Sequence, residues 1–113
     1  MHDLPELTDA PLKQAPEVDC RAPGFMGSAV AAGIRKDGRE DLALIAAREP
    51  VPAAGVFTTN LLKAAPVLVC REHVAAGRAR AILANSGGAN AAVGRAGLEA
   101  CRRTCRDAAR ALG

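Results

Sequence analysis

The chain has almost no aromatic residues: Phe25 and Phe57 are the only two, and tryptophan and tyrosine are absent. Hydrophobic residues nevertheless make up 50% of its 113 residues, and alanine supplies much of that share. A buried alanine stabilises a fold much less than a buried leucine or phenylalanine, because it removes less apolar surface from water. We therefore expect one domain with a thin core, which does not fold stably until something outside this sequence completes it.

Long apolar runs and clustered basic charge are also missing. No segment approaches the roughly 18 apolar residues of a transmembrane helix, and the acidic N-terminus lacks the features of a secretory signal. We therefore expect a cytoplasmic protein without a membrane partner. The net charge is only +3, from 15 basic and 12 acidic residues. This balance argues against nucleic-acid binding, and the arginines of the last segment are expected to form a solvated helix face.

Cysteine and histidine do not follow the spacing of a metal site. The four cysteines are Cys20, Cys70, Cys101 and Cys105, and the two histidines are His2 and His73. Structural zinc sites use closely spaced pairs of these residues, so no metal is expected. Disulfides are rare in the cytoplasm, and two cysteines four residues apart share one face of a helix, where they pack as small hydrophobic side chains.

The order of apolar and turn-forming segments predicts an α+β fold. Residues 1–22 contain several prolines and no sustained periodicity, so we interpret them as an extended lead-in to a domain of residues 23–113. The segments Gly24–Ile34 and Leu42–Ala47 flank the dipeptide Asp37-Gly38, which is typical of a hairpin turn. The prolines of Glu49–Pro52 are expected to end the second strand.

Further strands and one late helix are expected after these prolines. The segment Ala53–Thr59 predicts a third strand, Pro66–Cys70 a fourth, and residues 79–84 a fifth, whereas Arg71–Ala75 is too short for more than a turn or two of helix. Apolar residues at three- and four-residue intervals predict a one-sided helix over Leu98–Leu112, with Gly113 suited to its C-terminal cap.

The strongest candidate site is the polar turn that joins the last strand to this helix. Its candidate substrate-binding residues are Asn85, Ser86, Gly87 and Asn90. Glycine allows a tight turn or close approach to a ligand, asparagine and serine offer hydrogen-bonding groups, and the following helix presents free N–H groups. The turn also fits a plain connection between two elements. It matches neither the dinucleotide fingerprint nor the phosphate loop, so no cofactor is expected.

A second polar cluster, Thr58-Thr59-Asn60, follows a predicted strand. A threonine nucleophile needs an adjacent base or its own free α-amine, and the spacing supplies neither. Two strand residues and a turn asparagine are the simpler interpretation.

Several separated motifs, taken together, resemble the N-terminal part of the bifunctional ornithine acetyltransferase/N-acetylglutamate synthase family. The resemblance covers about residues 23–112, and it departs at Gly88, where the family usually has a second asparagine, and at Ala92-Val93. The strongest motifs are Ala54–Asn60 and Lys63–Val67. The others are Gly24-Phe25, Val30–Arg35, Asp41–Ile45, Arg71–His73, Asn85–Gly87 and Ala89–Ala91.

The resemblance implies a self-cleaving acetyltransferase of arginine biosynthesis with an α/β sandwich fold, two sheets lying between helices. Cleavage gives α and β chains, and the new N-terminal threonine carries the acetyl group from N-acetylornithine to glutamate; some members also use acetyl-CoA. The implied partners are therefore the remainder of the α chain, the β chain and these small substrates, in a hetero-oligomer of α and β chains.

The same resemblance implies that this sequence lacks the main catalytic groups. The family's Thr-Gly oxyanion motif and its Ala-Thr cleavage motif do not occur in residues 1–113. Thr58 and Thr59 match a different motif, so no catalytic residue is assigned in this chain. The alternative hypothesis is a truncated or degenerate fragment with a structural or interaction role and no part in catalysis.

Overall fold

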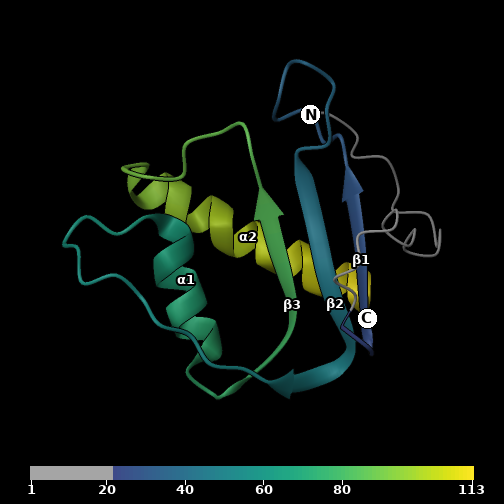
Figure 1. Ribbon diagram of the computed structural model, residues 1–113. Coiled ribbons are helices and arrows are strands. Elements are labelled where there is room, and N and C mark those ends of the chain that lie inside the picture. Colours follow the sequence, from purple (N-terminus) through teal and green to yellow (C-terminus); the bar gives the residue numbers. More distant parts are fainter. Residues whose placement is uncertain (1–21) are drawn as a thin grey trace.

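The computed structural model describes residues 22–113, which form a three-stranded antiparallel sheet and two helices (Figure 1). The elements in chain order are β1 (Phe25–Val30), β2 (Leu42–Pro52), α1 (Ala65–Val74), β3 (Arg78–Asn85) and α2 (Gly94–Leu112). The central strand is β2, with β1 on one side and β3 on the other. The α+β fold class is confirmed, whereas the lead-in expected for residues 1–22 lies outside the described residues apart from its last residue.

The predicted hairpin is confirmed. β1 and β2 pair antiparallel from Phe25 opposite Ala47 to Val30 opposite Leu42, and residues 31–41 connect them. Gly38 has a φ of +74°, a left-handed conformation that glycine adopts at little cost. The Asp37-Gly38 dipeptide therefore lies within this connection, which is longer than a tight hairpin turn because β1 ends at Val30 rather than Ile34.

The prediction that Glu49–Pro52 ends the second strand is wrong, because β2 continues to Pro52. The pairing with β1 stops at Ala47. Pro50 and Pro52 lie beyond it, where β2 forms no hydrogen bonds with β1, so their lack of an N–H group costs no hydrogen bond to β1. The pairing with β3 shifts in register between Ala46 and Val51, which is where a chain with prolines tolerates an irregularity.

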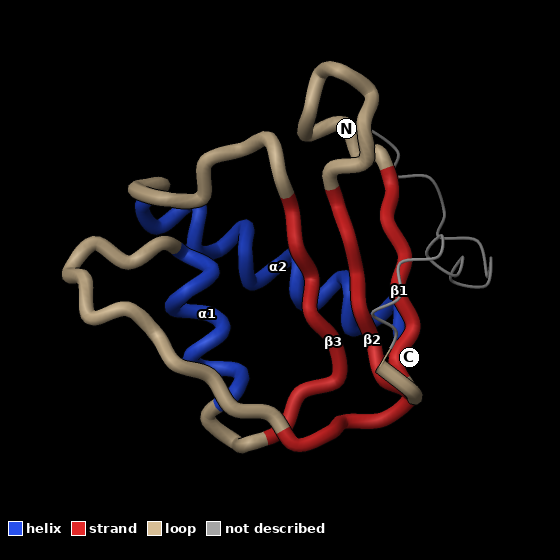
Figure 2. The backbone as a smooth tube through the Cα atoms, in the orientation of Figure 1, coloured by secondary structure: helices blue, strands red, loops and turns tan. Residues whose placement is uncertain are grey.

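The third predicted strand, Ala53–Thr59, is also wrong: this segment belongs to a long connection between β2 and α1 (Figure 2). Its β-branched and aromatic residues favour a strand only where a neighbouring strand offers hydrogen bonds and a surface to pack on. Here Val56 is 99% exposed, so it has no such surface.

The fourth predicted strand, Pro66–Cys70, is helical instead, and it runs on through Arg71 to give the ten residues of α1. Pro66 lies in the first turn, where proline favours the start of a helix because its missing N–H is not needed there. Ala65 and Val69 are buried, so tertiary packing outweighs the strand preference of the valines. The predicted strand at residues 79–84 is confirmed as β3.

The predicted amphipathic helix is confirmed as α2, although it begins at Gly94 rather than Leu98. Its half-buried residues repeat every three or four positions, and Gly113 ends the helix with a φ of +80°. The inward face comprises Leu98, Cys101, Cys105, Ala108 and Leu112. The two cysteines are half-buried, and burial raises the pKa of the Cys101 thiol.

The core of the described residues is as small as the composition predicts. Its buried apolar side chains are Ala46 and Ala47 of β2 and Ala65 and Val69 of α1. Helix α1 contacts α2 and β3, and α2 crosses the sheet in Figure 1. The Arg80 guanidinium of β3 donates to the carbonyl oxygens of Leu112 and Gly113 at 2.9 and 2.6 Å, which fixes the C-terminal end of α2 to the sheet. No helix within residues 22–113 is long and apolar enough to cross a membrane.

Candidate functional site

The turn between β3 and α2 lies against the loop between β1 and β2. The backbone N–H of Ser86 donates to the carbonyl oxygen of Asp41 at 2.9 Å. Gly87 lies so close to Arg35 that an added methyl group would overlap Arg35 Cγ, and one on Gly88 would lie 3.5 Å from Ile34 Cγ2. Two segments that are far apart in the sequence therefore form one continuous surface.

The structure places the four predicted binding residues in this turn. Asn85 is the last residue of β3, and its side-chain oxygen accepts a hydrogen bond from the Asn90 amide at 3.0 Å. Ser86 is tied to Asp41 through its backbone, and Gly87 has a φ of +89°, which an L-residue rarely adopts. The amide bridge closes the turn, while their role in substrate binding stays a prediction.

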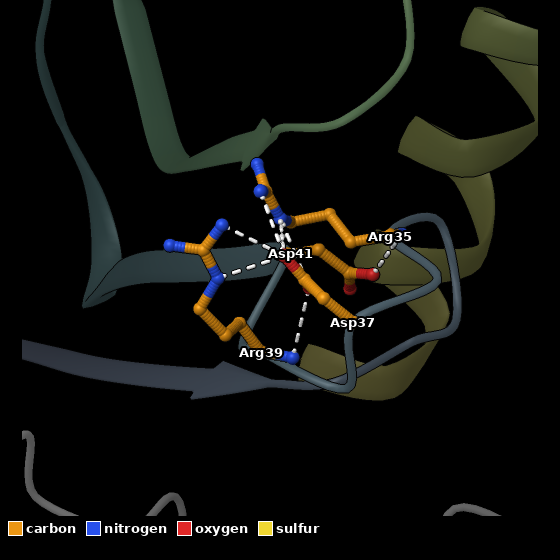
Figure 3. Close-up of polar contacts among 4 residues, drawn as sticks. All are labelled: Arg35, Asp37, Arg39 and Asp41. Carbon is orange, nitrogen blue, oxygen red and sulfur yellow. Dashed lines mark hydrogen bonds and ion pairs between the residues drawn. The ribbon is translucent and has the colours of Figure 1, made fainter.

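Asp41 holds the neighbouring loop in place, and sequence reasoning did not identify it as part of the site. Its side chain is buried, with 3% exposure, and its two carboxylate oxygens accept hydrogen bonds from the backbone N–H groups of Ala32 and Arg35, both at 2.7 Å. Figure 3 shows the bond from Arg35. The hydrogen bond from Arg35 holds the pKa of Asp41 below its ordinary value. The sequence feature that could have identified Asp41 is its position between a charged turn and an apolar strand.

The exposed tip of the same loop carries a cluster of opposite charges. Arg35 and Arg39 both pair with Asp37, at 2.9 and 2.7 Å (Figure 3). The hydrogen bond from Arg35, followed by that from Arg39, lowers the pKa of Asp37 from 3.8 to about 2. Two guanidinium groups therefore share one carboxylate at the exposed tip of this loop.

A shallow hollow lies where the connection before α1 approaches the start of α2. Its volume is about 290 Å³, and its walls are mostly apolar with two cationic side chains, Lys63 and Arg95. The Lys63 ammonium donates to the carbonyl oxygen of Asn60 at 2.7 Å. The lining residues are Lys63, Ala65, Leu68, Ala92, Val93, Gly94, Arg95 and Leu98. The family-like motif Lys63–Val67 therefore faces the start of α2 here.

The second polar cluster has a local structural role. Thr58 Oγ1 accepts a hydrogen bond from the backbone N–H of Asn60, and the Asn60 side chain accepts one from Leu62. Both threonines are exposed in the connection between β2 and α1. Within residues 22–113, no three side chains of the metal-binding types are grouped to hold a metal ion. The turn and hairpin loop thus offer hydrogen-bonding and cationic groups at a surface.

A protein-family model described as the ArgJ family matches residues 26–113. The arginine biosynthesis bifunctional protein ArgJ of Gloeobacter violaceus is 52% identical over 93 residues, which is 81% of this chain and 23% of that protein. The ArgJ protein of Syntrophotalea carbinolica is 50% identical over 90 residues, or 80% of this chain and 23% of that protein. The chain thus spans about a quarter of the length of these curated relatives.

Two solved structures are also similar. The ornithine acetyltransferase of Mycobacterium tuberculosis, in complex with ornithine, matches with a TM-score of 0.69 and 49% identity over 73% of this chain and 43% of that chain. The ArgJ protein of Bacillus halodurans matches with a TM-score of 0.63 and 37% identity over 69% of this chain and 41% of that chain. The family match, the curated relatives and the shared fold agree: this chain belongs to the ArgJ family.

Proposed function

We propose that this chain is the N-terminal portion of an acetyltransferase that moves the acetyl group of N-acetylornithine to glutamate in arginine biosynthesis. The observation that carries the proposal is the ArgJ-family match over residues 26–113, since it spans every described helix and strand except the first residue of β1. The similar enzyme of Mycobacterium tuberculosis binds ornithine, which is the product that remains after N-acetylornithine loses its acetyl group.

The proposed reaction passes through an acetyl-threonine whose threonine lies outside this chain. The threonine hydroxyl attacks the acetyl carbonyl, the carbon–nitrogen bond breaks, and ornithine leaves as the free amine. The α-amine of glutamate then attacks the ester and releases the threonine hydroxyl. An N-terminal threonine can use its own α-amine as base, and hydrogen-bond donors stabilise the oxyanion in each step.

The relative lengths of the similar proteins support cleavage into α and β chains. This chain covers 43% of the solved Mycobacterium tuberculosis chain but only 23% of the Gloeobacter violaceus relative, over comparable matched lengths. The solved chain is therefore about half as long as that relative. A precursor cut once near its middle gives chains of this length.

In this proposal the described residues act as scaffold and as one wall of the substrate site. The turn of Asn85, Ser86, Gly87 and Asn90 contributes hydrogen-bonding groups, and the hairpin loop fixes its position through Asp41. The enzyme works in the cytoplasm without a metal or a bound cofactor, with acetyl-CoA as a second acetyl donor. Its partners are the remainder of the α chain and the β chain.

Acetyl transfer from N-acetylornithine to glutamate tests the proposal. The chain is assayed alone and after coexpression with the complementary segment of the Gloeobacter violaceus relative. We expect activity only in the coexpressed pair. The positive control uses the relative's own N-terminal segment, and the negative control replaces the threonine at its cleavage site with alanine.

Inactivity of the pair, together with activity of the positive control, would contradict the proposal. That result would favour a fragment with a structural or interaction role and no part in catalysis. Gly88, which stands where the family usually has asparagine, is the feature of the turn that fits this alternative.

A further inference from the structure

The connection between β2 and α1, residues 53–64, presents large apolar side chains to solvent. Val56, Leu61 and Leu62 are 99%, 95% and 87% exposed, more than any other large hydrophobic residue in the described part of the chain. Single exposed apolar residues are common on protein surfaces, but a group of three on one connection indicates a contact surface. We name residues 53–64 the docking loop.

The docking loop has a defined local conformation. The backbone N–H of Asn60 donates to Thr58 Oγ1 at 3.2 Å, and the backbone N–H of Leu62 donates to Asn60 Oδ1 at 3.0 Å. The Lys63 ammonium donates to the Asn60 carbonyl oxygen at 2.7 Å. These bonds fix the turn that carries Leu61 and Leu62, which lowers the entropy that a partner must remove on binding.

The inner side of the docking loop packs on the rest of the molecule. The backbone N–H of Ala53 donates to the Gly77 carbonyl oxygen at 2.9 Å. Gly55 packs closely against Phe57 and Val74. A methyl group added at Gly55 would lie 2.8 Å from the Phe57 ring and 3.5 Å from Val74 Cγ2. Phe57 is half-buried, so the loop has an anchored inner side and an apolar outer side.

The charge of the docking loop narrows the class of partner. Lys63 is its only ionisable residue, and its ammonium is already hydrogen-bonded within the loop. Nucleic acids and anionic lipid surfaces attract clustered basic residues, which this loop does not have. An apolar protein surface matches Val56, Leu61 and Leu62.

We propose that the docking loop binds the remainder of the acetyltransferase through Val56, Leu61 and Leu62. The inference rests on the proposed function, because that function supplies the partner. The chain covers 43% of the solved Mycobacterium tuberculosis chain and 23% of the Gloeobacter violaceus relative. More than half of the related fold therefore lies outside the part that this chain shares, and it provides the protein surface that covers the loop.

Copurification of the tagged chain with the complementary segment of the Gloeobacter violaceus relative tests the docking loop. Two variants carry Val56→Ser, or Leu61→Ser with Leu62→Ser, and the matched control carries Arg71→Ser with Arg103→Ser, which alters exposed residues of α1 and α2. We expect both docking-loop variants to lower the copurified amount at least tenfold and the control to leave it unchanged. Equal copurification of all variants would overturn the proposal.

Thiol accessibility provides a second measurement on the assembled complex. Leu61→Cys and, separately, Arg71→Cys are treated with a maleimide, and modification at each site is quantified by mass spectrometry. We expect Leu61→Cys to react at least tenfold more slowly than Arg71→Cys. Equal rates would overturn the proposal, and so would protection of Leu61→Cys without the remainder, because that result assigns the loop to a second copy of this chain.

The two proposals fail in different ways. If the unaltered chain does not copurify with the complementary segment, although the relative's own N-terminal segment does, the proposed function is contradicted. If the unaltered chain copurifies and the docking-loop variants copurify equally well, only the docking loop is wrong.

Discussion

The backbone N–H of Ser86 donates to the carbonyl oxygen of Asp41 at 2.9 Å, and this bond ties the turn after β3 to the loop before β2. The Asp41 carboxylate in turn accepts the backbone N–H groups of Ala32 and Arg35. One residue thus uses its backbone to hold the candidate site and its side chain to hold the neighbouring loop. The geometry of the candidate site therefore depends on residues outside the family-like turn itself.

Gly87→Ala should destabilise the complex of this chain with the proposed remainder of the acetyltransferase more than Gly38→Ala does. Both glycines have positive φ, which costs an alanine about 1–2 kcal/mol. A methyl group at Gly87 would also overlap Arg35 Cγ, whereas the space around Gly38 is open. We expect Gly87→Ala to cost at least about 1 kcal/mol more, as overpacking usually does. Urea unfolding of the complex measures the difference, and equal costs would contradict the expectation.

Acid should weaken the hairpin loop. The pKa of Asp37 is lowered from 3.8 to about 2 by Arg35, and that of Asp41 is lowered by backbone hydrogen bonds. A carboxyl group whose pKa is lower in the folded than in the unfolded state stabilises the folded protein at pH values above its unfolded-state pKa. This stabilisation is lost as the pH falls through its folded-state pKa. The free energy of unfolding should therefore fall between about pH 4 and pH 2.

Urea unfolding of the complex at a series of pH values measures this dependence. Asp37→Asn should flatten the slope in this window, because the asparagine does not titrate. Glu40→Gln provides the matched control on the same loop. An unchanged slope for Asp37→Asn would assign the acid sensitivity to other carboxyl groups.

The parts of the fold that the sequence predicted are those with strong local signals. Two apolar segments on either side of Asp37-Gly38 indicated the hairpin, although residues 31–41 form a longer connection than a tight turn, and the repeat of Leu98, Cys101 and Cys105 indicated the inward face of α2. The predictions failed at Ala53–Thr59, which is a connection without a neighbouring strand, and at Pro66–Cys70, a short apolar run that matches either a strand or a packed helix. Tertiary contacts decided both outcomes, because Val69 is buried in α1, whereas Val56 is exposed and has no surface to pack on.

The candidate site shows the same division. Asn85, Ser86, Gly87 and Asn90 were found because glycines and polar residues between a strand and a helix are visible in the sequence. Asp41 and Arg35 were missed because their importance comes from a hydrogen bond to Ser86 and a contact with Gly87, both across a large sequence separation. Such contacts follow from the antiparallel pairing of β2 with β3, which brings Leu42 opposite Asn85.

Arg80→Ala should release the C-terminal end of α2. The Arg80 guanidinium donates to the carbonyl oxygens of Leu112 and Gly113 and to that of Ala47. Loss of hydrogen bonds from a charged donor usually costs about 1.5–3 kcal/mol, and we expect about 2 kcal/mol here. Arg80→Lys should recover only part of this, because an ammonium lacks the planar arrangement of donors. Urea unfolding of the complex measures the stability of both Arg80 variants, with Arg103→Ala at an exposed position as the control. Equal stabilities of the Arg80→Ala and Arg103→Ala complexes would contradict the role of Arg80 in holding the end of α2.

The open face of the sheet should make folding of this chain depend on the remainder of the protein. Ile45 of β2 and Ile82 of β3 are paired in register and are 50% and 67% exposed. The buried apolar residues of the described part are three alanines and one valine, which supply little hydrophobic free energy. We expect the isolated chain to lack a cooperative thermal transition and the complex to show one.

Differential scanning calorimetry of the chain, the remainder and the complex measures this dependence. If the proposed partner covers this face, the Ile45→Ala and Ile82→Ala variants should each lower the stability of the complex by about 2 kcal/mol or more, because each would leave a cavity in that contact. Val30→Ala on β1, also 50% exposed, is the matched control and should cost less if the partner covers the face shared by Ile45 and Ile82. A cooperative transition of the chain alone would mean that α1, α2 and this sheet suffice as a folding unit.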